Sequence, residues 1–329
     1  MQNYISAKPE KIWSKLAVER VLRSHVLASI ATGFARSKAE LYDFFSKTFC
    51  SQQYGLDLIE PLVGKNLLFL HQERMINLRE TITATKFGRR VSEMYVDPVS
   101  AVIIRECLKQ GAEHLTDFSF LHMICHTPDT YPKSYPKRKE VEELEVFVDA
   151  HSFEFMVPIP DEGLDVEYGA FLGEVKGAKI LKAWIQEASE EEIIEQFSFE
   201  PGDLYRLINT VKWLLYASYE IGRLFGHQDL SPKILGLRDR VNKGVKGELL
   251  PIVKLKGVGR IRGRLLFDAG FKSVGDLKSA SINQLLEVPM IGPGLVKRIK
   301  EQVGCQLKGE ELSKLKTGES WEQKAISEF

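Results

Sequence analysis

Apolar positions recur at helical spacing over most of this chain. In residues 18–34 (VERVLRSHVLASIATGF) an apolar residue returns at every fourth position, which predicts one buried face of an α-helix. Ser37 is placed to cap a second helix that runs to about Cys50, with Glu40 at the reciprocal position of a capping box. A third helix is expected over about residues 56–70.

Two short stretches of alternating polarity follow, MINLRE and TITAT in residues 75–85. Alternation of this kind is typical of strands, so the two stretches predict a small hairpin. Another helix is expected to open near Lys86. Helices and a small hairpin in this order are the parts of a winged helix, a module that binds DNA in some proteins and serves as a rigid spacer in others.

Residues 115–230 return to helical periodicity, which predicts a helical bundle. The proline-rich segment TPDTYPKSYPKRK (127–139) interrupts it, because each proline disfavours helix at the residue before it. A basic connector is expected over residues 231–245. The helices of the bundle are expected near residues 140–151, 165–186, 189–197 and 203–225.

The longest helical pattern carries an aromatic residue opposite its apolar stripe. In PGDLYRLINTVKWLLYASYEIGRLFG (201–226), with Asp203 as the expected N-cap, Trp213 lies about 150° from the centre of the stripe. Arg206 lies two turns earlier, in line with Trp213 and about 10.5 Å away along the axis. An indole that stacks on a base and a guanidinium that holds a phosphate suit a single strand of nucleic acid. The alternative is a helix buried on all sides, in which Trp213 packs on a second neighbour.

Two glycine turns, KGVGR (256–260) and PMIGPG (289–294), lie between short predicted helices, the pattern of a helix-hairpin-helix. Gly257 and Gly259 flank Val258 in the first turn, and glycine reaches positive φ with no side chain in the way. The turn amides and the following helix N-terminus are therefore expected to face a phosphate, without reading the base sequence. The flanking helices are expected at about residues 246–254, 260–269, 281–287 and 294–302.

Three arginines follow the first turn at once, Arg260, Arg262 and Arg264. Arg260 and Arg264 lie one helical turn apart, so both are expected to reach the backbone of one DNA strand. Arg262 points elsewhere. The alternative for this segment is a pair of helical turns with C-capping glycines, and the alternative for the basic region around it is a solvated basic face.

The second turn is the weaker candidate for DNA binding. Met290 stands where glycine is usual, and only Lys297 and Arg298 follow it with positive charge. Whether this turn contacts DNA or only packs against the first is open.

Charge is unevenly spread, although the formal net charge of the 329 residues is zero. Residues 140–203 hold 18 acidic and 3 basic residues, whereas residues 231–300 hold 15 basic and 5 acidic ones. Such an asymmetry indicates that the second region meets a polyanion. The hydrophobic fraction of 44% and the charged fraction of 27% are those of an ordinary globular protein.

Several classes of protein do not fit the sequence. No apolar run approaches the roughly 18 residues of a membrane span, and the N-terminus lacks a signal-peptide pattern. The four cysteines are scattered without a CxxC pair, so we expect no disulfide framework, no zinc site and a cytosolic compartment. There is no GxxxxGK[ST] phosphate loop. His122 and His126 have metal-ligand spacing but no further evident ligand, and we expect them to be packing residues.

Five segments carry a family resemblance: PEKIWSKLAVERVLRSH, TKFGRRVSEMYVDPVSA, LHMICHTPD, EPGDLYRLINTVKWL and ELLPIVKLKGVGRIRGRLLFDAG. Together they resemble the C-terminal half of the archaeal Hjm (Holliday-junction-migration) DNA repair helicases and their eukaryotic counterpart HELQ, in superfamily 2. The resemblance implies a mainly α fold of three domains: a winged helix, a helical-bundle ratchet domain and a helix-hairpin-helix domain. Their expected bounds are 18–108, 109–245 and 246–304, with a linker at 1–17 and a flexible tail at 305–329.

The resemblance also implies roles for particular residues. Arg206 and Trp213 occupy the places of a ratchet pair that contacts the translocating strand in that family. Arg260, Arg262 and Arg264 match basic positions of its terminal domain, which holds the emerging strand.

The function implied is that of the DNA-binding part of an ATP-dependent 3′–5′ helicase that acts in DNA repair and at stalled replication forks. Its partners would be single-stranded and forked DNA and the motor domains of the same helicase. ATP and magnesium would bind in those motor domains, whose motifs this sequence lacks, so no cofactor and no catalytic residue is expected here. The alternative is a motor-free DNA-binding adaptor or scaffold that docks a separate ATPase. The expected location is the cytoplasm, on the nucleoid, or the nucleus if the source is eukaryotic.

The last seven residues, QKAISEF, place Gln323, Ile326 and Phe329 three positions apart. This spacing resembles the box with which repair proteins dock on the sliding clamp, with two apolar side chains as a plug. An incidental tail is the alternative, because three fixed positions in seven recur by chance.

Overall fold

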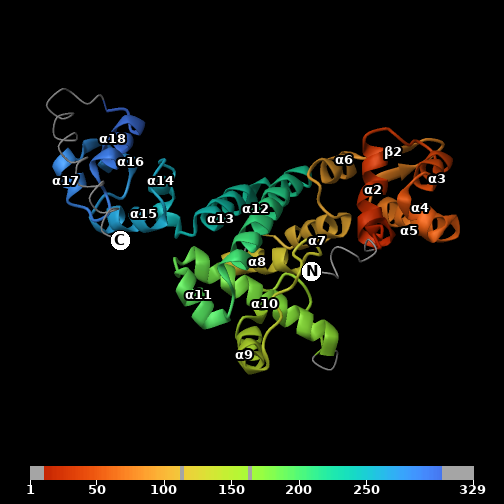
Figure 1. Ribbon diagram of the computed structural model, residues 1–329, viewed down its shortest axis with the longest axis horizontal. Coiled ribbons are helices and arrows are strands. Elements are labelled where there is room, and N and C mark those ends of the chain that lie inside the picture. The colour runs from red at the N-terminus through yellow and green to blue at the C-terminus, as the bar shows by residue number, and fades with distance from the viewer. Residues whose placement is uncertain (1–10, 112–114, 162–164, 306–329) are drawn as a thin grey trace, which may run out of the picture.

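The computed structural model describes residues 11–111, 115–161 and 165–305. These residues are mainly helical, as expected. Figure 1 shows the winged helix at one end of the molecule, the hairpin domain (residues 246–304) at the other, and the helical bundle between them.

The first part of the chain forms the winged helix. Its elements are η1 (Lys15–Ala17), α2 (Glu19–Ala31), α3 (Lys38–Ser46), α4 (Phe49–Tyr54), α5 (Leu56–Gln72), β1 (Ile76–Leu78), β2 (Ile82–Ala84), α6 (Lys86–Glu93) and α7 (Pro98–Leu108). The two strands pair antiparallel, with Asn77 opposite Thr83, which confirms the predicted hairpin. Ser37 caps α3 by accepting the Glu40 N–H at 3.1 Å.

The single helix predicted from Ser37 to Cys50 was wrong in its extent. α3 ends at Ser46, and Thr48 starts α4 by accepting the Ser51 N–H at 3.3 Å. The capping box at Ser37 is also incomplete, because the Glu40 carboxylate accepts the Arg36 N–H instead. The Thr48 hydroxyl cap therefore separates two helices, although the apolar pattern of the sequence continues through both.

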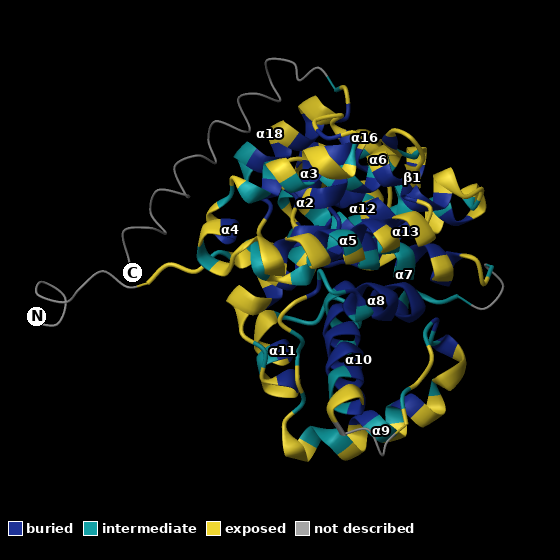
Figure 2. Cartoon of the chain, turned by 90° about the vertical axis from the view of Figure 1, so that its right-hand side faces the viewer, coloured by how far each residue is buried: buried dark blue, intermediate teal, exposed yellow. Residues whose placement is uncertain are grey.

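The bundle contains the longest helices of the described chain. Its elements are α8 (Asp117–His126), η2 (Arg138–Glu140), α9 (Val141–Ala150), η3 (Ser152–Glu154), α10 (Asp165–Ile185), α11 (Glu190–Phe197), α12 (Pro201–Leu224), η4 (Gln228–Leu230) and α13 (Ser231–Lys243). Figure 2 shows α8 buried along its length and much of α10 buried, with α9 and α11 exposed on their outer sides. The core of the bundle is continuous with that of the winged helix.

Residues 231–245 were predicted as a basic connector, without a secondary structure. This stretch is helix α13, and Ile234, Leu237 and Val241 are buried at helical spacing against α12 and α10. Asp203 does not cap α12 either. Glu200 is the N-cap, and Pro201 is the first residue of the helix, a position where proline costs no hydrogen bond.

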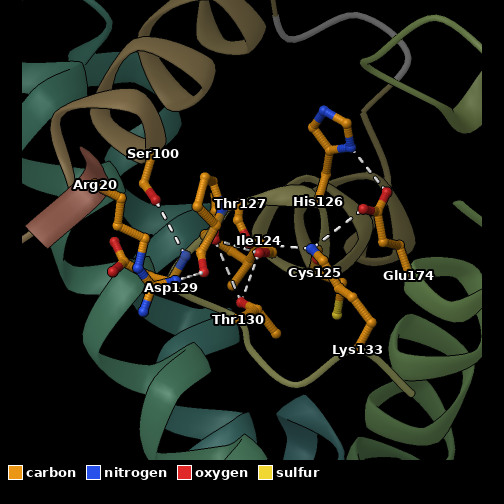
Figure 3. A network of polar contacts seen from close by, with 11 residues as sticks. Arg20, Ser100, Ile124, Cys125, His126, Thr127, Asp129, Thr130, Lys133 and Glu174 are labelled. Carbon is orange, nitrogen blue, oxygen red and sulfur yellow. Dashed lines mark hydrogen bonds and ion pairs between the residues drawn. The ribbon is translucent and has the colours of Figure 1, made fainter. Parts of the chain in front are cut away.

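The turn after α8 joins the bundle to the winged helix (Figure 3). A guanidinium nitrogen of Arg20 in α2 donates to the Pro128 carbonyl at 2.7 Å, and the Asp97 N–H donates to the Asp129 carboxylate at 2.9 Å. Beside it, the buried carboxylate of Glu174 binds Lys133 at 3.1 Å and His126 at 2.8 Å. These contacts make the segment LHMICHTPD a joint between the two parts.

The hairpin domain has a core of its own. Its elements are η5 (Gly247–Leu249), α14 (Leu250–Val253), α15 (Arg260–Asp268), α16 (Val274–Ser279), α17 (Ile282–Leu286) and α18 (Pro293–Gln302). α16 was not predicted. It begins with a capping box between Ser273 and Asp276, which stands in the sequence as S-x-x-D.

Candidate nucleic-acid interface

Helix α12 presents Arg206 to solvent. Leu204, Leu207 and Val211 of the apolar stripe are buried, and Arg206 lies on another face with 48% of its side chain exposed. Its guanidinium donates to the Asp203 carboxylate at 3.0 Å, one turn earlier. An exposed pair of this kind stabilises little and leaves the arginine available to a phosphate.

Trp213 is not free, although it lies off the buried stripe as predicted. Its ring is half-buried against the main core, and the indole Nε1–H donates to the Met94 carbonyl at 2.9 Å. Met94 is the C-cap of α6, so the indole ties α12 to the winged helix. The alternative of packing on a second neighbour therefore holds in part. Stacking of a base on the remaining exposed surface stays a prediction.

The two glycine turns have matching backbones. Gly257 has φ +89°, and a Cβ there would lie 2.9 Å from a methyl of Leu295 in the second hairpin. Met290 adopts φ +61° at the equivalent position, which costs a side-chain-bearing residue roughly 1–2 kcal/mol. Gly259 and Gly292 precede α15 and α18, and neither helix has a side-chain N-cap. Such helix ends keep unpaired N–H groups that can bind an anion.

Val258 does not belong to the exposed part of the first turn. Its side chain is buried in the core of the hairpin domain, and its N–H donates to the Leu255 carbonyl at 3.1 Å. Neither the side chain nor the amide of Val258 is open to a ligand in this structure, so its predicted role in DNA binding is reduced to shaping the turn. It supports the turn from beneath.

Arg260 faces the bundle rather than solvent. Its guanidinium carbon lies 4.2 Å from the centroid of the Trp184 ring, and Nη2 donates to the Ala188 carbonyl at 2.5 Å. Burial lowers the pKa of Arg260, against the pull of nearby glutamates. The cation–π contact with α10 and the hydrogen bond to the loop after it together dock the hairpin domain on the bundle.

Arg264 lies on the same face as Arg260, as predicted, and it is held by carboxylates. Its Nε and Nη2 donate to the two oxygens of Glu187 at 2.8 and 2.7 Å, and Nη2 also reaches Glu248 at 2.8 Å. These hydrogen bonds, chiefly those to Glu187, raise the pKa of Arg264. Burial alone would raise the pKa of Glu187, but the bonds from Arg264 and from the Lys246 N–H outweigh it and lower that pKa.

In this structure the shared face of Arg260 and Arg264 meets the bundle, and their contact with a DNA strand stays a prediction. The acidic and basic regions of the chain meet each other here, across residues 184–191 and α15. A cavity of about 440 Å³ lies between them, lined by both arginines, Glu187 and Trp184. Arg262 points elsewhere, as predicted: it donates to the carbonyls of Met290 at 3.1 Å and Gly257 at 3.2 Å, which ties the two turns together.

Two of the exposed cations of the hairpin domain lie beside the glycine turns. Lys256 and Arg298 are exposed, and no carboxylate pairs with either within the described residues. The Arg298 guanidinium lies 3.8 Å from the Cβ position of Gly257. The Gln302 amide bonds the Lys256 backbone at 2.7 Å and the Arg298 carbonyl at 3.0 Å, so the two residues adjoin. Sequence reasoning missed Lys256 and undervalued Arg298, although each stands beside a glycine turn.

His122 packs among aromatic rings. In the described part of the chain, no cluster of three or more histidine, cysteine or acidic side chains could hold a metal ion. His122 is fully buried, and neither ring nitrogen has a hydrogen-bond partner. Burial lowers the pKa of His122 to about 3. Packing was predicted correctly, but the ring is not hydrogen-bonded. His126 instead pairs with Glu174.

The candidate clamp-binding residues Gln323, Ile326 and Phe329 lie outside the described residues. No helix within the described ranges is long and apolar enough to span a membrane.

Known proteins match nearly the whole chain. Residues 118–244 match the family described as "Archaeal helicase, domain 4", and residues 249–304 match the "SAM-like Helix-hairpin-helix tandem". Proteins named "ATP-dependent DNA helicase Hel308" from Methanocella arvoryzae and Pyrococcus horikoshii are 39% and 37% identical to it. The alignments cover 92% and 94% of this chain but only 41% and 43% of theirs, so the chain spans less than half the length of these relatives.

Proposed function

The chain belongs to the Hel308 family of helicases, whose C-terminal half it matches, and from this membership we propose that it guides single-stranded DNA in an ATP-dependent 3′–5′ DNA helicase. The observation that carries the proposal is the face of α12 on which Arg206 and Trp213 lie two turns apart. Arg206 holds a phosphate and the exposed part of Trp213 stacks on a base. Contacts of these two kinds bind a strand without regard to its sequence.

The hairpin domain binds the same strand further along its path. The uncapped starts of α15 and α18, at Gly259 and Gly292, offer backbone N–H groups to phosphates, and Lys256 and Arg298 add positive charge. Gly257 allows the two turns to approach closely. In the proposed role of this domain as the exit clamp, these N–H groups and basic side chains contact the emerging strand before Arg260 and Arg264 do.

Arg260, Arg262 and Arg264 take a different part in the proposal. They fix the hairpin domain to the bundle and its two turns to each other. A direct role of Arg260 and Arg264 in holding the emerging strand requires the hairpin domain to separate from residues 184–191. That step exchanges the Glu187 carboxylate for a DNA phosphate.

The remaining parts of the proposal concern the whole helicase. ATP and Mg²⁺ would bind outside these 329 residues, because the sequence has no phosphate loop. The substrate would be forked DNA at stalled replication forks, in DNA repair. Gln323, Ile326 and Phe329 would dock the helicase on the sliding clamp, and the protein would lie on the nucleoid.

A binding titration tests the proposal. The full chain should bind single-stranded oligonucleotides of unrelated sequence with similar affinity and should not hydrolyse ATP with DNA present. Arg206→Ala should weaken binding to every sequence alike. Binding confined to one sequence, or DNA-stimulated ATP hydrolysis by this chain, would contradict the proposal. A motor-free adaptor is favoured instead if the chain activates an ATPase encoded by a separate gene.

A further inference from the structure

The exposed face of α12 holds a second aromatic residue. Tyr205 is 71% exposed, directly before Arg206 near the N-terminal end of the helix. Among the described residues, no ion pair, ring contact or side-chain hydrogen bond involves its phenol ring. Tyr205 therefore contributes little to the packing of the bundle, and its ring is open to a ligand.

A lysine without a counter-ion lies between Tyr205 and Trp213. The Lys212 ammonium donates to the side-chain oxygens of Asn209 and of Asn242 in α13, each at 3.2 Å. Within the described residues no carboxylate pairs with Lys212. Two neutral amides orient the ammonium but leave its charge uncompensated, so it can bind an anion.

The spacing places these groups in one row. Tyr205, Asn209 and Trp213 follow one another at four-residue intervals and so lie along one side of α12. From the first to the third is about 12 Å along the axis. Stacked nucleotides of one strand are about 3.4 Å apart. The row therefore spans about three to four nucleotide steps.

We propose that Tyr205 and Lys212 form a second nucleotide site of the single-strand path: a base stacks on Tyr205, and Lys212 contacts a phosphate between Tyr205 and Trp213. The Asn209 and Asn242 amides hold the ammonium in place. α12 and α13 lie side by side (Figure 1), so the site spans both helices. This inference rests on the proposed function, because it names further contacts of the same strand.

Binding of fluorescein-labelled oligo-dT to the full chain at several salt concentrations tests the inference. Tyr205→Ala should weaken binding about 5- to 150-fold, the range for one stacked base, whereas Tyr205→Phe should stay within about twofold of wild type. Lys212→Gln should lower the slope of log K against log salt by about 0.7, the value for one phosphate of a single strand.

Matched controls are Tyr135→Ala and Lys139→Gln, since both side chains are exposed elsewhere on the bundle. Neither should change affinity or slope. If wild type binds and Tyr205→Ala binds as tightly as Tyr135→Ala, the second site is refuted while the proposed function stands. A lower melting temperature for Lys212→Gln with an unchanged slope would mean that Lys212 only joins α12 to α13. If wild type itself does not bind, the proposed function fails first.

Discussion

Replacing Lys256 and Arg298 together by alanine should weaken the binding of the chain to single-stranded DNA and flatten its salt dependence. Both side chains are exposed, and neither is paired with a carboxylate in the described residues. Arg264 offers the opposite case, because Glu187, Glu248 and Asp268 already surround its guanidinium. The two sets of basic residues should therefore respond differently.

The size of each effect follows from these contacts. If Lys256 and Arg298 each neutralise one phosphate, the slope of log K against log salt should fall by about 1.4, from ~0.7 per phosphate of a single strand. Arg264→Ala should leave the slope nearly unchanged. It should instead loosen the hairpin domain by about 1.5–3 kcal/mol, the value of a hydrogen bond to a charged group.

Fluorescence anisotropy with a 20-mer oligonucleotide at five salt concentrations measures the slopes. Hydrogen exchange of the α15 amides measures the docking of the hairpin domain. If Arg264→Ala lowers the slope as much as the double variant does, Arg264 reaches DNA and the docked arrangement is not the one that binds. If the double variant keeps the wild-type slope, the strand does not pass the glycine turns.

Three further changes test the packing around the interface. Trp213→Ala should lower the free energy of unfolding by about 1–3 kcal/mol, less than the ~3–5 of a fully buried ring, and weaken DNA binding as well; an unchanged melting temperature would mean that the bond to Met94 does not hold α12. The pKa of Glu187 is lowered in the folded chain, so its pair with Arg264 stabilises docking above the ordinary pKa of about 4.5. This stabilisation is lost as the pH falls through the folded pKa. Glu187→Gln should show faster hydrogen exchange of the α15 amides already at pH 7. His122 has a folded pKa of about 3 against 6.5, so the unfolded chain binds more protons and this residue should cost about 2 kcal/mol of stability between pH 8 and pH 5; His122→Phe should melt progressively higher than wild type as the pH falls, and a constant difference would contradict the assignment.

Local patterns predicted much of the fold. The Ser37 cap, the hairpin at residues 75–85 and the helix over residues 201–226 depend on neighbours a few positions away, and the structure has all three. Helix α13 was not predicted from the sequence, because the prediction weighed the basic residues of this segment and not its three apolar residues at helical spacing. The charge of the exposed positions of a helix therefore does not show whether its opposite side is buried.

The site depends on contacts that a local pattern does not contain. Trp213 bonds to Met94, 119 residues earlier, and Arg264 bonds to Glu187, 77 residues earlier. Glu187 also has φ +75°, a backbone conformation that its residue type does not predict. Periodicity placed Arg260 and Arg264 correctly on one face, but only the tertiary structure shows that this face meets the bundle.

Photo-crosslinking of single-stranded DNA tests the central claim most directly, namely that α12 and the glycine turns carry one strand. Oligonucleotides with one bromodeoxyuridine at successive positions would be irradiated on the full chain, and the crosslinked peptides identified by mass spectrometry. Crosslinks should fall on the exposed face of α12, at Tyr205, Arg206 and Trp213, and beside the glycine turns, at Lys256 and Arg298, in the order of the bases. Crosslinks confined to α9 and α11, or spread evenly over the surface, would contradict the account.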